Sequence, residues 1–384
     1  MDENIEIYGF CDEKFVAVKD AFQKNFETEG EVGASFAVAL NGKFIVDIWG
    51  GYADKAKSRP WEKDTIVNVY STTKVMTIIC ALMLVDRGQL DLDAPVANYW
   101  PEFAQNGKEK IPVRQIFSHT SGLAGWEEKI DIKDFYNWNK VVSLLAAQKP
   151  WWDPGTSSGY HATTHGYLLG ELVRRITGKS LGAFFREEVS GPLNADFHIG
   201  FGKEYDHRVA DLVPWALPQN GEPSFMEMDP QSLFGRVFTN PVIEIKEVLS
   251  REWRAAEIPA AGGHGNARSV ARVGSAIACG GEVDGVRLLG IETIKKAMVE
   301  QSYSQDLVLM IPIRFGVGFG LPSKEMPFLR PNTVWWGGAG GSVIIMDLEN
   351  KLSISYVMNQ MKMTIVGDMR SVNLINAVYE GLGK

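Results

Sequence analysis

Cysteine is scarce in this chain of 384 residues, which contains three, at Cys11, Cys80 and Cys279. The set is odd in number, widely spaced and without a C-x-x-C pair, so it argues against a disulfide framework. Cys80 lies within an apolar stretch, where a cysteine usually serves as a small core residue. A reduced, cytoplasmic compartment fits these three thiols best.

Long hydrophobic runs and blocks of like charge are also absent. The longest apolar window, residues 75–85, is far too short to span a bilayer. The acidic start of the chain, Met1–Glu6, lacks the basic and apolar regions of a signal peptide. The net charge of −8 and the lack of any run of five like charges argue against nucleic-acid and membrane-surface binding. We therefore expect a globular protein without nucleic-acid or membrane partners, and the sequence leaves a homo-oligomer open.

Histidine is sparse as well, with six residues and no H-E-x-x-H motif. His161 and His165 stand four positions apart and could share a helical face. No carboxylate lies at the spacing of a zinc site, however. We therefore expect no metal and no cofactor.

The patterns that are present divide the chain into strand-like ends and a helical middle. An Asn-Gly pair separates the apolar runs 34–40 and 44–49, which indicates a hairpin with a type I′ turn. The remaining apolar patterns predict strands at 66–69, 342–346 and 352–358, and helices at 12–27, 164–176, 269–279 and 370–381.

Strands near both termini predict one sheet to which both ends of the chain contribute. Residues 1–75 and 265–384 would then form a discontinuous domain that carries the sheet. Residues 76–264 would form a mostly helical domain, and a cleft would lie between the two parts.

Ser71 and Lys74 form an S-x-x-K pair at the start of the apolar stretch. Positions i and i+3 share one face of a helix, so the lysine Nζ can fold back toward the serine Oγ. The positive end of the helix dipole lies beside them and favours negative charge that develops there. A hydroxyl with an amine neighbour is the activated nucleophile that serine acyl-transfer enzymes need. Alone, a match of two residues in four is a weak signal.

Tyr160 follows a segment rich in Gly and Ser and precedes a predicted helix, where a side chain can point into a cleft. A phenol with a pKa near 10 is a poor base, but a neighbouring ammonium such as Lys74 would lower that pKa and make proton transfer feasible. The alternative is a tyrosine that merely packs at the start of a helix.

A glycine-rich segment near the C-terminus, Trp335–Ser342, has four glycines in five positions. Such a segment before a strand allows the backbone to approach a ligand closely, at an entropic cost. A strand edge there could donate a backbone N–H to an oxyanion. A simple turn or bulge is the alternative.

A second serine motif must be weighed, because residues 155–159 satisfy G-x-S-x-G around Ser157. That motif requires a preceding apolar strand and a following helix. Here Pro150 and Pro154 oppose a central strand, and no alternating βα pattern surrounds the site. Ser157 is therefore a poor candidate for the nucleophile.

Taken together, the three segments resemble in order and spacing the serine β-lactamase-like hydrolases. These include class C β-lactamases, D,D-peptidases and, most similar to this chain, the family VIII carboxylesterases. Ser71 and Lys74 match the S-x-x-K motif, and Tyr160 matches the tyrosine of Y-x-N. Trp336–Gly338 occupies the place of K-T-G, as the W-G-G variant of esterase members.

The resemblance covers nearly the whole chain, from about residue 30 to residue 380. It implies an α/β (α+β) fold of the β-lactamase/transpeptidase type, with an antiparallel sheet from both termini, flanking helices and a mostly helical inserted domain. It also implies that Ser71, Lys74 and Tyr160 are catalytic. The backbone N–H groups of Ser71 and Ala339 would form the oxyanion hole.

Two departures from the family pattern bear on the substrate. Ala162 stands where the Asn of Y-x-N would be, and Trp336 where the Lys of K-T-G would be. In β-lactamases these two residues help to hold the amide side chain and the carboxylate of the substrate. Their loss favours neutral esters, because an indole offers stacking area and one N–H donor instead of a charge.

Aromatic, histidine and glycine residues near these segments are candidates for substrate binding: Trp336, Gly337, Gly338, His161, Trp126, Trp152 and His264. The sequence thus predicts a serine carboxylesterase that hydrolyses short-chain carboxylic esters through an acyl-serine intermediate. Weak β-lactam hydrolysis, a D,D-peptidase-like amidase activity and acyl transfer are alternatives within the same fold. A non-catalytic penicillin-binding-like module is the alternative from another class.

Overall fold

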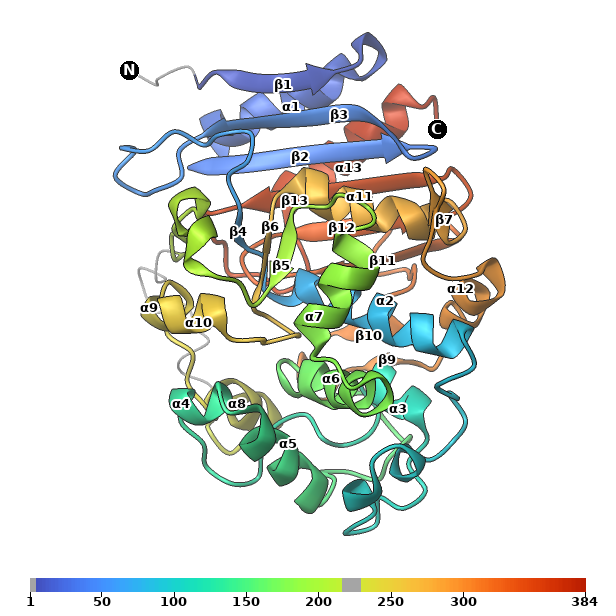
Figure 1. The fold of residues 1–384 in the computed structure, drawn as a ribbon. Helices are drawn as coiled ribbons and strands as arrows, with labels where there is room; N and C mark the ends of the chain where they lie inside the picture. The colour runs from blue at the N-terminus through green and yellow to red at the C-terminus, as the bar shows by residue number, and fades with distance from the viewer. Residues whose placement is uncertain (1–4, 216–228) are drawn as a thin grey trace.

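The structure, a computed structural model, describes residues 5–215 and 229–384. Its largest sheet has six antiparallel strands in the order β1-β3-β2-β13-β12-β11. The strands are β1 Ile7–Cys11, β2 Gly33–Leu40, β3 Lys43–Gly51, β11 Thr333–Gly337, β12 Val343–Asp347 and β13 Leu352–Met358. Three come from each end of the chain and meet where β2 pairs with β13 (Figure 1). The predicted single sheet from both termini is confirmed.

The predicted hairpin is present between β2 and β3. Leu40 pairs with Lys43 across a two-residue turn, and both turn residues have positive φ, 49° at Asn41 and 77° at Gly42. These are the angles of a type I′ turn, whose twist matches that of the flanking strands.

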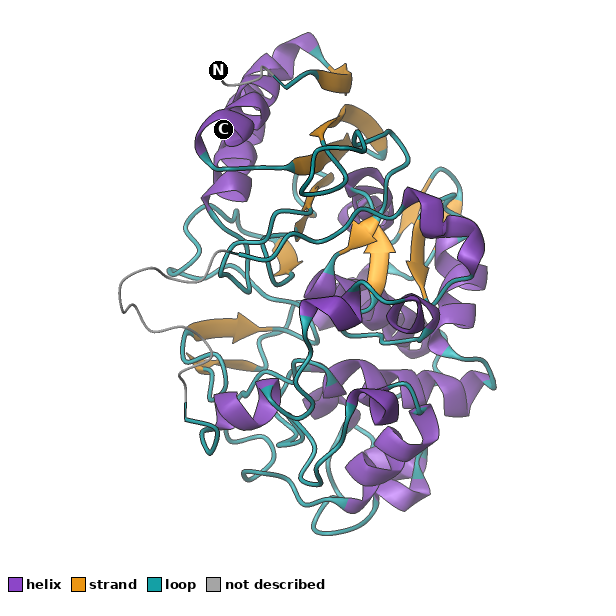
Figure 2. Cartoon of the chain, turned by 90° about the vertical axis from the view of Figure 1, so that its left-hand side faces the viewer, coloured by secondary structure: helices purple, strands orange, loops and turns teal. Residues whose placement is uncertain are grey.

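Both faces of the sheet are covered by helices. Helix α11, Ala267–Ala278, packs on β2, β12 and β13, in front of the sheet in Figure 1. Helices α1, Val16–Thr28, and α13, Met369–Gly381, lie side by side on the other face (Figures 1 and 2). Because both faces are covered, β12 and β13 are buried along their whole length and read as continuous apolar runs.

The middle of the chain is mainly helical, as predicted. Its helices are α2 Thr73–Asp86, α3 Val113–Phe117, α4 Ile132–Phe135, α5 Trp138–Ala147, α6 Thr164–Thr177, α7 Leu181–Phe185, α8 Leu233–Phe238, α9 Ile245–Val248 and α10 Arg251–Ala255. Helix α6 ends where the sequence predicts, with Gly178 in the left-handed conformation at its C-terminus. The division into domains 1–75 with 265–384 and 76–264 stays a prediction.

Several short elements join these parts and escaped the sequence patterns. They are β5 Phe197–Ile199, β6 Gly263–Gly265, β7 Glu282–Val283, β8 Val286–Arg287, α12 Ile291–Ala297, β9 Ser302–Gln305 and β10 Pro312–Phe315, whereas β4 Val67–Asn68 falls within the strand predicted at 66–69. Strands β4, β6 and β5 form a small sheet, and β9 and β10 form a separate hairpin.

Helix α2 connects the sheet to the helical region. Its residues from Thr73 to Leu84 are all buried, which explains why its sequence is apolar on every side. It packs along α6, and the single 3₁₀ turn before it, Tyr70–Thr72, contacts β11. Among the described residues, no helix is long and apolar enough to cross a membrane.

Candidate active site

The turn that leads into α2 places Ser71 between the sheet and the helical region. Tyr70, just before it, has φ of 43°, in the left-handed region that non-glycine residues rarely adopt. Strained backbone of this kind persists where the surrounding structure enforces it, and it is frequent at functional sites. Ser71 itself is 7% exposed, so its hydroxyl lies in a largely dry environment.

Lys74 lies one turn further along and points back toward Ser71, as the i, i+3 spacing predicts. Its Nζ is 3.2 Å from Ser71 Oγ, and it donates to the carbonyls of Ala162 at 2.5 Å and Ala260 at 3.0 Å. Lys74 is 1% exposed, and within the described part of the chain no carboxylate pairs with it. Burial lowers the pKa of Lys74 well below its ordinary value.

The contacts of Lys74 suit an uncharged amine. A neutral amine has two N–H donors and one lone pair, and the two carbonyls can accept both donors. The lone pair then faces the hydroxyl of Ser71, which can donate its proton to it. Lys74 is therefore placed to act as a base toward Ser71 without any further group.

Tyr160 completes the cluster on the side of α6. Its ring lies 4.7 Å from Lys74 Nζ, and its hydroxyl accepts the indole N–H of Trp336 at 3.3 Å. Burial raises the pKa of Tyr160 above its ordinary value, and hydrogen bonds with Ser71 and Trp336 oppose that rise. The expectation that Lys74 would lower the pKa of Tyr160 is wrong, because burial of the phenol outweighs the groups that stabilise its ionised form.

Trp336 is buried and lies in a layer of rings rather than in an open pocket. Its ring centre is 5.4 Å from that of Tyr160 and 5.3 Å from that of Phe315. The sequence pointed to its N–H as a donor for substrate, but the structure gives that N–H to Tyr160. Trp336 thus holds the hydroxyl end of Tyr160.

The glycine-rich segment lies directly against the Ser71 turn. A Cβ on Gly338 would come within 2.1 Å of the Val69 carbonyl oxygen, so only glycine allows this approach. Ser342 fixes the contact from the other side, because its Oγ donates to the Val69 carbonyl at 2.9 Å and lies 3.0 Å from Thr72 Oγ1.

Ala339, the proposed second donor of the oxyanion hole, follows Gly338 in this segment. Within the described residues its N–H makes no backbone hydrogen bond, whereas those of Gly338 and Gly340 do. A free N–H beside the serine turn can donate a hydrogen bond to an oxyanion. The role of the Ser71 and Ala339 N–H groups stays a prediction.

Three buried histidines, His119, His161 and His165, pack behind Lys74 and Tyr160. His161 Nε2 accepts the Leu123 N–H at 3.2 Å, and His119 Nδ1 accepts the His161 N–H at 3.1 Å. A nitrogen that accepts a backbone N–H cannot carry a proton, so both rings must be neutral. Burial accordingly lowers the pKa of all three rings, that of His161 to about 3.

These neutral rings predict a loss of stability in mild acid. The unfolded chain binds protons below the ordinary histidine pKa of about 6.5, whereas the folded chain does not. The three rings therefore make their full contribution to the free energy of unfolding above that pH. The contribution is lost as pH decreases toward the lowered pKa values. Buried His264, whose pKa is also lowered to about 3, adds to this effect, so we expect the free energy of unfolding in urea to drop by about 5 kcal/mol between pH 7.5 and pH 5.5.

A variant provides the control for this expectation. His165→Gln removes one titrating ring while its amide can still donate to the Phe117 carbonyl, as the ring nitrogen can at 3.1 Å. The loss between the two pH values should then shrink by about a quarter, because one of four buried rings no longer titrates. Equal stability of the wild type at both pH values would contradict the assignment of neutral rings.

The other predicted binding residues are scattered. The ring centre of Trp152, in the segment before Tyr160, lies 6.0 Å from that of His161, and the two rings meet edge to face. Trp126 is 2% exposed and sits in the core, where its indole N–H donates to Val141. His264 is buried in β6, where its ring packs against Phe201 and its Nδ1 lies 2.9 Å from the Gly262 carbonyl oxygen, away from Ser71, Lys74 and Tyr160. The structure thus brings Trp152 and His161 to the site, but not Trp126 or His264.

The competing serine motif is not supported by its surroundings. Ser157 lies in an irregular segment with no preceding strand, and its carbonyl accepts the indole N–H of Trp152 at 3.0 Å. A nucleophile elbow would need a strand before it. No group of three or more His, Cys, Asp or Glu side chains positioned for a metal ion is found among the described residues.

Some site residues have no signal in the sequence. The carbonyls of Ala162 and Ala260 hold Lys74, but any residue type could supply them. Asp306 accepts the backbone N–H of Tyr160 at 2.9 Å from a distant turn. Ser342 lies at the end of the glycine-rich segment, but the sequence assigned no role to its hydroxyl.

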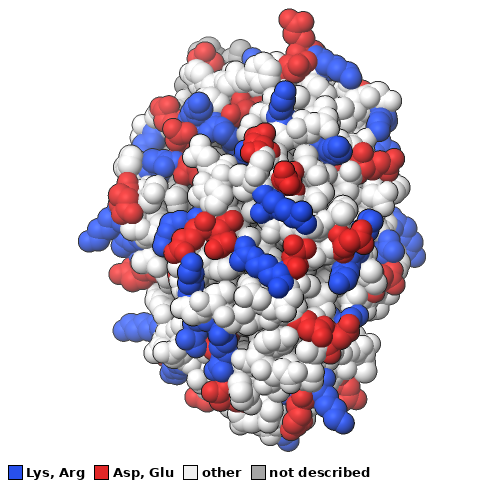
Figure 3. All heavy atoms as spheres, turned by 45° about the vertical axis from the view of Figure 1, so that its right-hand side comes forward, with Lys and Arg blue, Asp and Glu red and all other residues white. Residues whose placement is uncertain are grey.

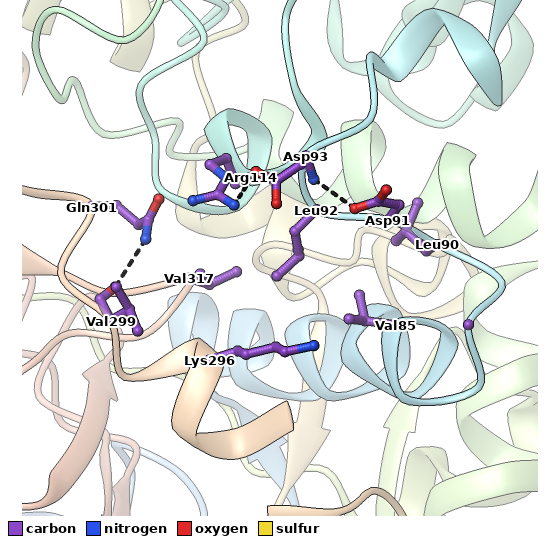
Figure 4. Close-up of a pocket in the computed structure, with 11 residues that line it drawn as sticks. Val85, Leu90, Asp91, Leu92, Asp93, Arg114, Lys296, Val299, Gln301 and Val317 are labelled. Carbon is purple, nitrogen blue, oxygen red and sulfur yellow. Dashed lines mark hydrogen bonds and ion pairs between the residues drawn. The ribbon is translucent and has the colours of Figure 1, made fainter. Parts of the chain in front are cut away.

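A hollow of about 470 Å³ lies elsewhere, at the end of α2 opposite Ser71 (Figure 4). Val85 and Val317 contribute to its apolar floor, Lys296 extends across it, and Arg114 pairs with Asp93 at its rim. Ser71, Lys74 and Tyr160 do not line it, so it is separate from the candidate active site.

The comparisons with known proteins agree with this geometry. A sequence model of the family described as Beta-lactamase matches residues 18–374. The esterase/beta-lactamase LipL of Mycobacterium tuberculosis is 33% identical over 377 residues, which cover 95% of this chain and 86% of LipL.

Two solved structures are similar over almost their full length. A family VIII carboxylesterase is 40% identical with a TM-score of 0.91, over 98% of this chain and 100% of its own. A penicillin-binding protein homologue from Caulobacter crescentus is 39% identical with a TM-score of 0.91, over 98% and 100% of the two chains. This chain therefore belongs to the Beta-lactamase family, which confirms the family resemblance drawn from its motifs.

Proposed function

We propose that the protein is a serine carboxylesterase that hydrolyses short-chain carboxylic esters through an acyl-enzyme on Ser71. The observation that carries this proposal is the buried, unpaired Lys74, whose Nζ lies 3.2 Å from Ser71 Oγ. An amine kept neutral beside a serine hydroxyl is a base that works at neutral pH without a metal. The names of LipL and of the family VIII carboxylesterase structure support the same reaction class.

In the acylation step, Ser71 Oγ attacks the ester carbonyl carbon while its proton passes to Lys74 Nζ. The carbonyl oxygen becomes an oxyanion, which the N–H groups of Ser71 and Ala339 would stabilise. The C–O bond to the alcohol then breaks, and the alcohol oxygen takes a proton from the Tyr160 hydroxyl. Tyr160 recovers its proton from the Lys74 ammonium, whose Nζ lies 4.7 Å from the Tyr160 ring.

In the deacylation step, a water molecule replaces the alcohol. The Tyr160 and Lys74 pair takes one proton from the water as its oxygen attacks the acyl carbon, and the second tetrahedral oxyanion occupies the same hole. The bond to Ser71 Oγ breaks, the serine regains its proton and the carboxylic acid leaves. Microscopic reversibility assigns the same groups to both halves of the reaction.

The charged groups next to the oxyanion segment support a neutral substrate. Arg370 donates to the Gly340 carbonyl at 2.8 Å, but it is fully buried and paired with Glu31 and Asp368. The backbone of Lys362 forms an isolated antiparallel β-bridge with that of Gly340, and the Lys362 ammonium pairs with the Glu29 carboxylate. Of the described residues, these two cations beside the segment are thus each paired with an acid and are not available for a substrate carboxylate.

This preference can be measured against a β-lactam. We expect kcat/KM for p-nitrophenyl butyrate to exceed that for the anionic cephalosporin nitrocefin by about 10³-fold or more, since an unpaired desolvated charge is a strong barrier to binding. Nitrocefin turnover equal to or faster than ester turnover would favour the β-lactamase alternative. Transfer of the butyryl group to added methanol would reveal acyltransferase activity.

The surface and the cysteines fit an intracellular enzyme of small molecules. On the face shown in Figure 3, acidic and basic side chains are interspersed rather than gathered by sign. The three cysteines are all free thiols. We propose a reducing compartment such as the cytoplasm for this protein, because free thiols persist there.

A further inference from the structure

The turn between β9 and β10 closes over the segment that carries Tyr160. Asp306, the first residue of this turn, is fully buried. Its Oδ1 accepts three backbone N–H groups, those of Tyr160, Val308 and Leu309, each at 2.9 Å. Asp306 Oδ1 thus stabilises the turn internally and also links it to the backbone of Tyr160.

A second bond runs beside the first. The N–H of Leu307 donates to the Ser158 carbonyl at 2.9 Å. The turn therefore forms hydrogen bonds with the residues before and after Gly159. The Tyr160 segment, residues 151–163, contains neither helix nor strand. Its backbone therefore depends on contacts with other elements for its position.

The same hairpin also supports the aromatic layer. Phe315, in β10, lies 5.3 Å from the Trp336 ring and 4.9 Å from the His119 ring. Trp336 holds the hydroxyl end of Tyr160 through its indole N–H, while Asp306 holds the main-chain end. Tyr160 is thus fixed at both ends by elements outside its own segment.

We propose that Asp306 is a positioning residue for Tyr160, whose main chain it fixes so that the phenol hydroxyl stays within reach of Ser71. This inference rests on the proposed function, in which Tyr160 transfers a proton to the leaving alcohol. Proton transfer needs heavy atoms within hydrogen-bond reach, so a shift of about 1 Å in Tyr160 lowers the rate steeply.

The chain offers a conservative variant at this position. Asp306 Oδ2 is buried and has no hydrogen-bond partner among the described residues. Asp306→Asn therefore keeps the Oδ1 acceptor and breaks no existing bond at Oδ2. Asp306→Ala removes the acceptor of all three N–H groups, and Asp306→Leu, which is close in size and has no acceptor, serves as the second deletion variant if the alanine variant does not fold.

The test measures kcat and KM for p-nitrophenyl butyrate in two backgrounds, wild type and Tyr160→Phe. We expect Asp306→Ala to lower kcat by about 10- to 100-fold with KM changed by less than about threefold. In the Tyr160→Phe background the same substitution should lower kcat by less than about twofold, because its effect passes through the lost hydroxyl. Asp306→Asn should retain kcat within about fivefold of wild type.

Equal losses in both backgrounds would overturn the positioning role, as would wild-type kcat in a folded Asp306→Ala or Asp306→Leu variant. Thermal unfolding of each variant shows that the comparison is made on folded protein. If Tyr160→Phe itself retains wild-type kcat, the proposed mechanism fails. If Tyr160→Phe is impaired and the Asp306 deletions are not, only this inference fails.

Discussion

Replacing Ser71 with alanine is expected to lower kcat/KM for p-nitrophenyl butyrate by at least about 10⁴-fold, because no other group can carry the acyl intermediate. The hydroxyl makes few structural contacts, with Lys74 Nζ at 3.2 Å and with Tyr160. Lys74 keeps both of its carbonyl acceptors in the variant. The fold should therefore survive, with thermal unfolding close to that of wild type.

Ser157 provides the matched control for this experiment. It belongs to the G-x-S-x-G segment, and it lies outside the cluster around Lys74. Ser157→Ala should retain wild-type turnover and labelling by a fluorophosphonate probe, whereas Ser71→Ala should lose both. Wild-type turnover in folded Ser71→Ala would remove Ser71 from the mechanism.

Loss of the base should have the second-largest effect. Lys74→Met is expected to lower kcat by about 10²- to 10⁴-fold, the range that general bases contribute. Lys74→Arg is the sharper variant, because a guanidinium keeps its donors but is always protonated and cannot accept the serine proton. We expect Lys74→Arg to be as inactive as Lys74→Met at every pH between 5 and 9.

The pH profile of the wild type carries the same information. Burial lowers the pKa of Lys74, so the amine is neutral above that lowered value and protonated below it. Turnover should therefore fall as pH decreases through the lowered pKa of Lys74. The rates are measured before the protein has time to unfold in acid. A Lys74→Arg variant with wild-type turnover would contradict a neutral lysine base.

Lys108 supplies a structural control for these lysine variants. It is also buried, and its Nζ donates to the carbonyls of Gln105 at 2.9 Å and Gln148 at 2.5 Å, away from the cluster. Lys108→Met should lower stability and leave kcat unchanged. The contrast separates the loss of a buried amine from the loss of a base.

Much of the site follows from local spacing. Ser71 and Lys74 meet because residues three apart share a helical face, and Gly338 approaches the serine turn because it lacks a side chain. The sheet follows from period-two and apolar runs at both ends of the chain, and the Asn-Gly turn follows from its dipeptide.

What escaped prediction depends on contacts between distant parts of the chain. Burial raises the pKa of Tyr160 and lowers that of Lys74, and local spacing does not show how deeply either group is buried, so the predicted direction for Tyr160 was wrong. Asp306 reaches Tyr160 through a turn whose sequence carries no motif. Trp126 is buried by rings from α4 and α6, which loop composition cannot show.

Mass spectrometry of the acyl-enzyme tests the central claim most directly. The protein is mixed briefly with p-nitrophenyl butyrate, quenched in acid and digested. We predict a mass increase of one butyryl group on the peptide that contains Ser71, and fragmentation of that peptide should localise the group to Ser71. The Ser71→Ala variant should show no such increase. A butyryl group on Ser157 or on a cysteine, or ester turnover with no adduct at Ser71 even in a slowed Tyr160→Phe variant, would contradict the account.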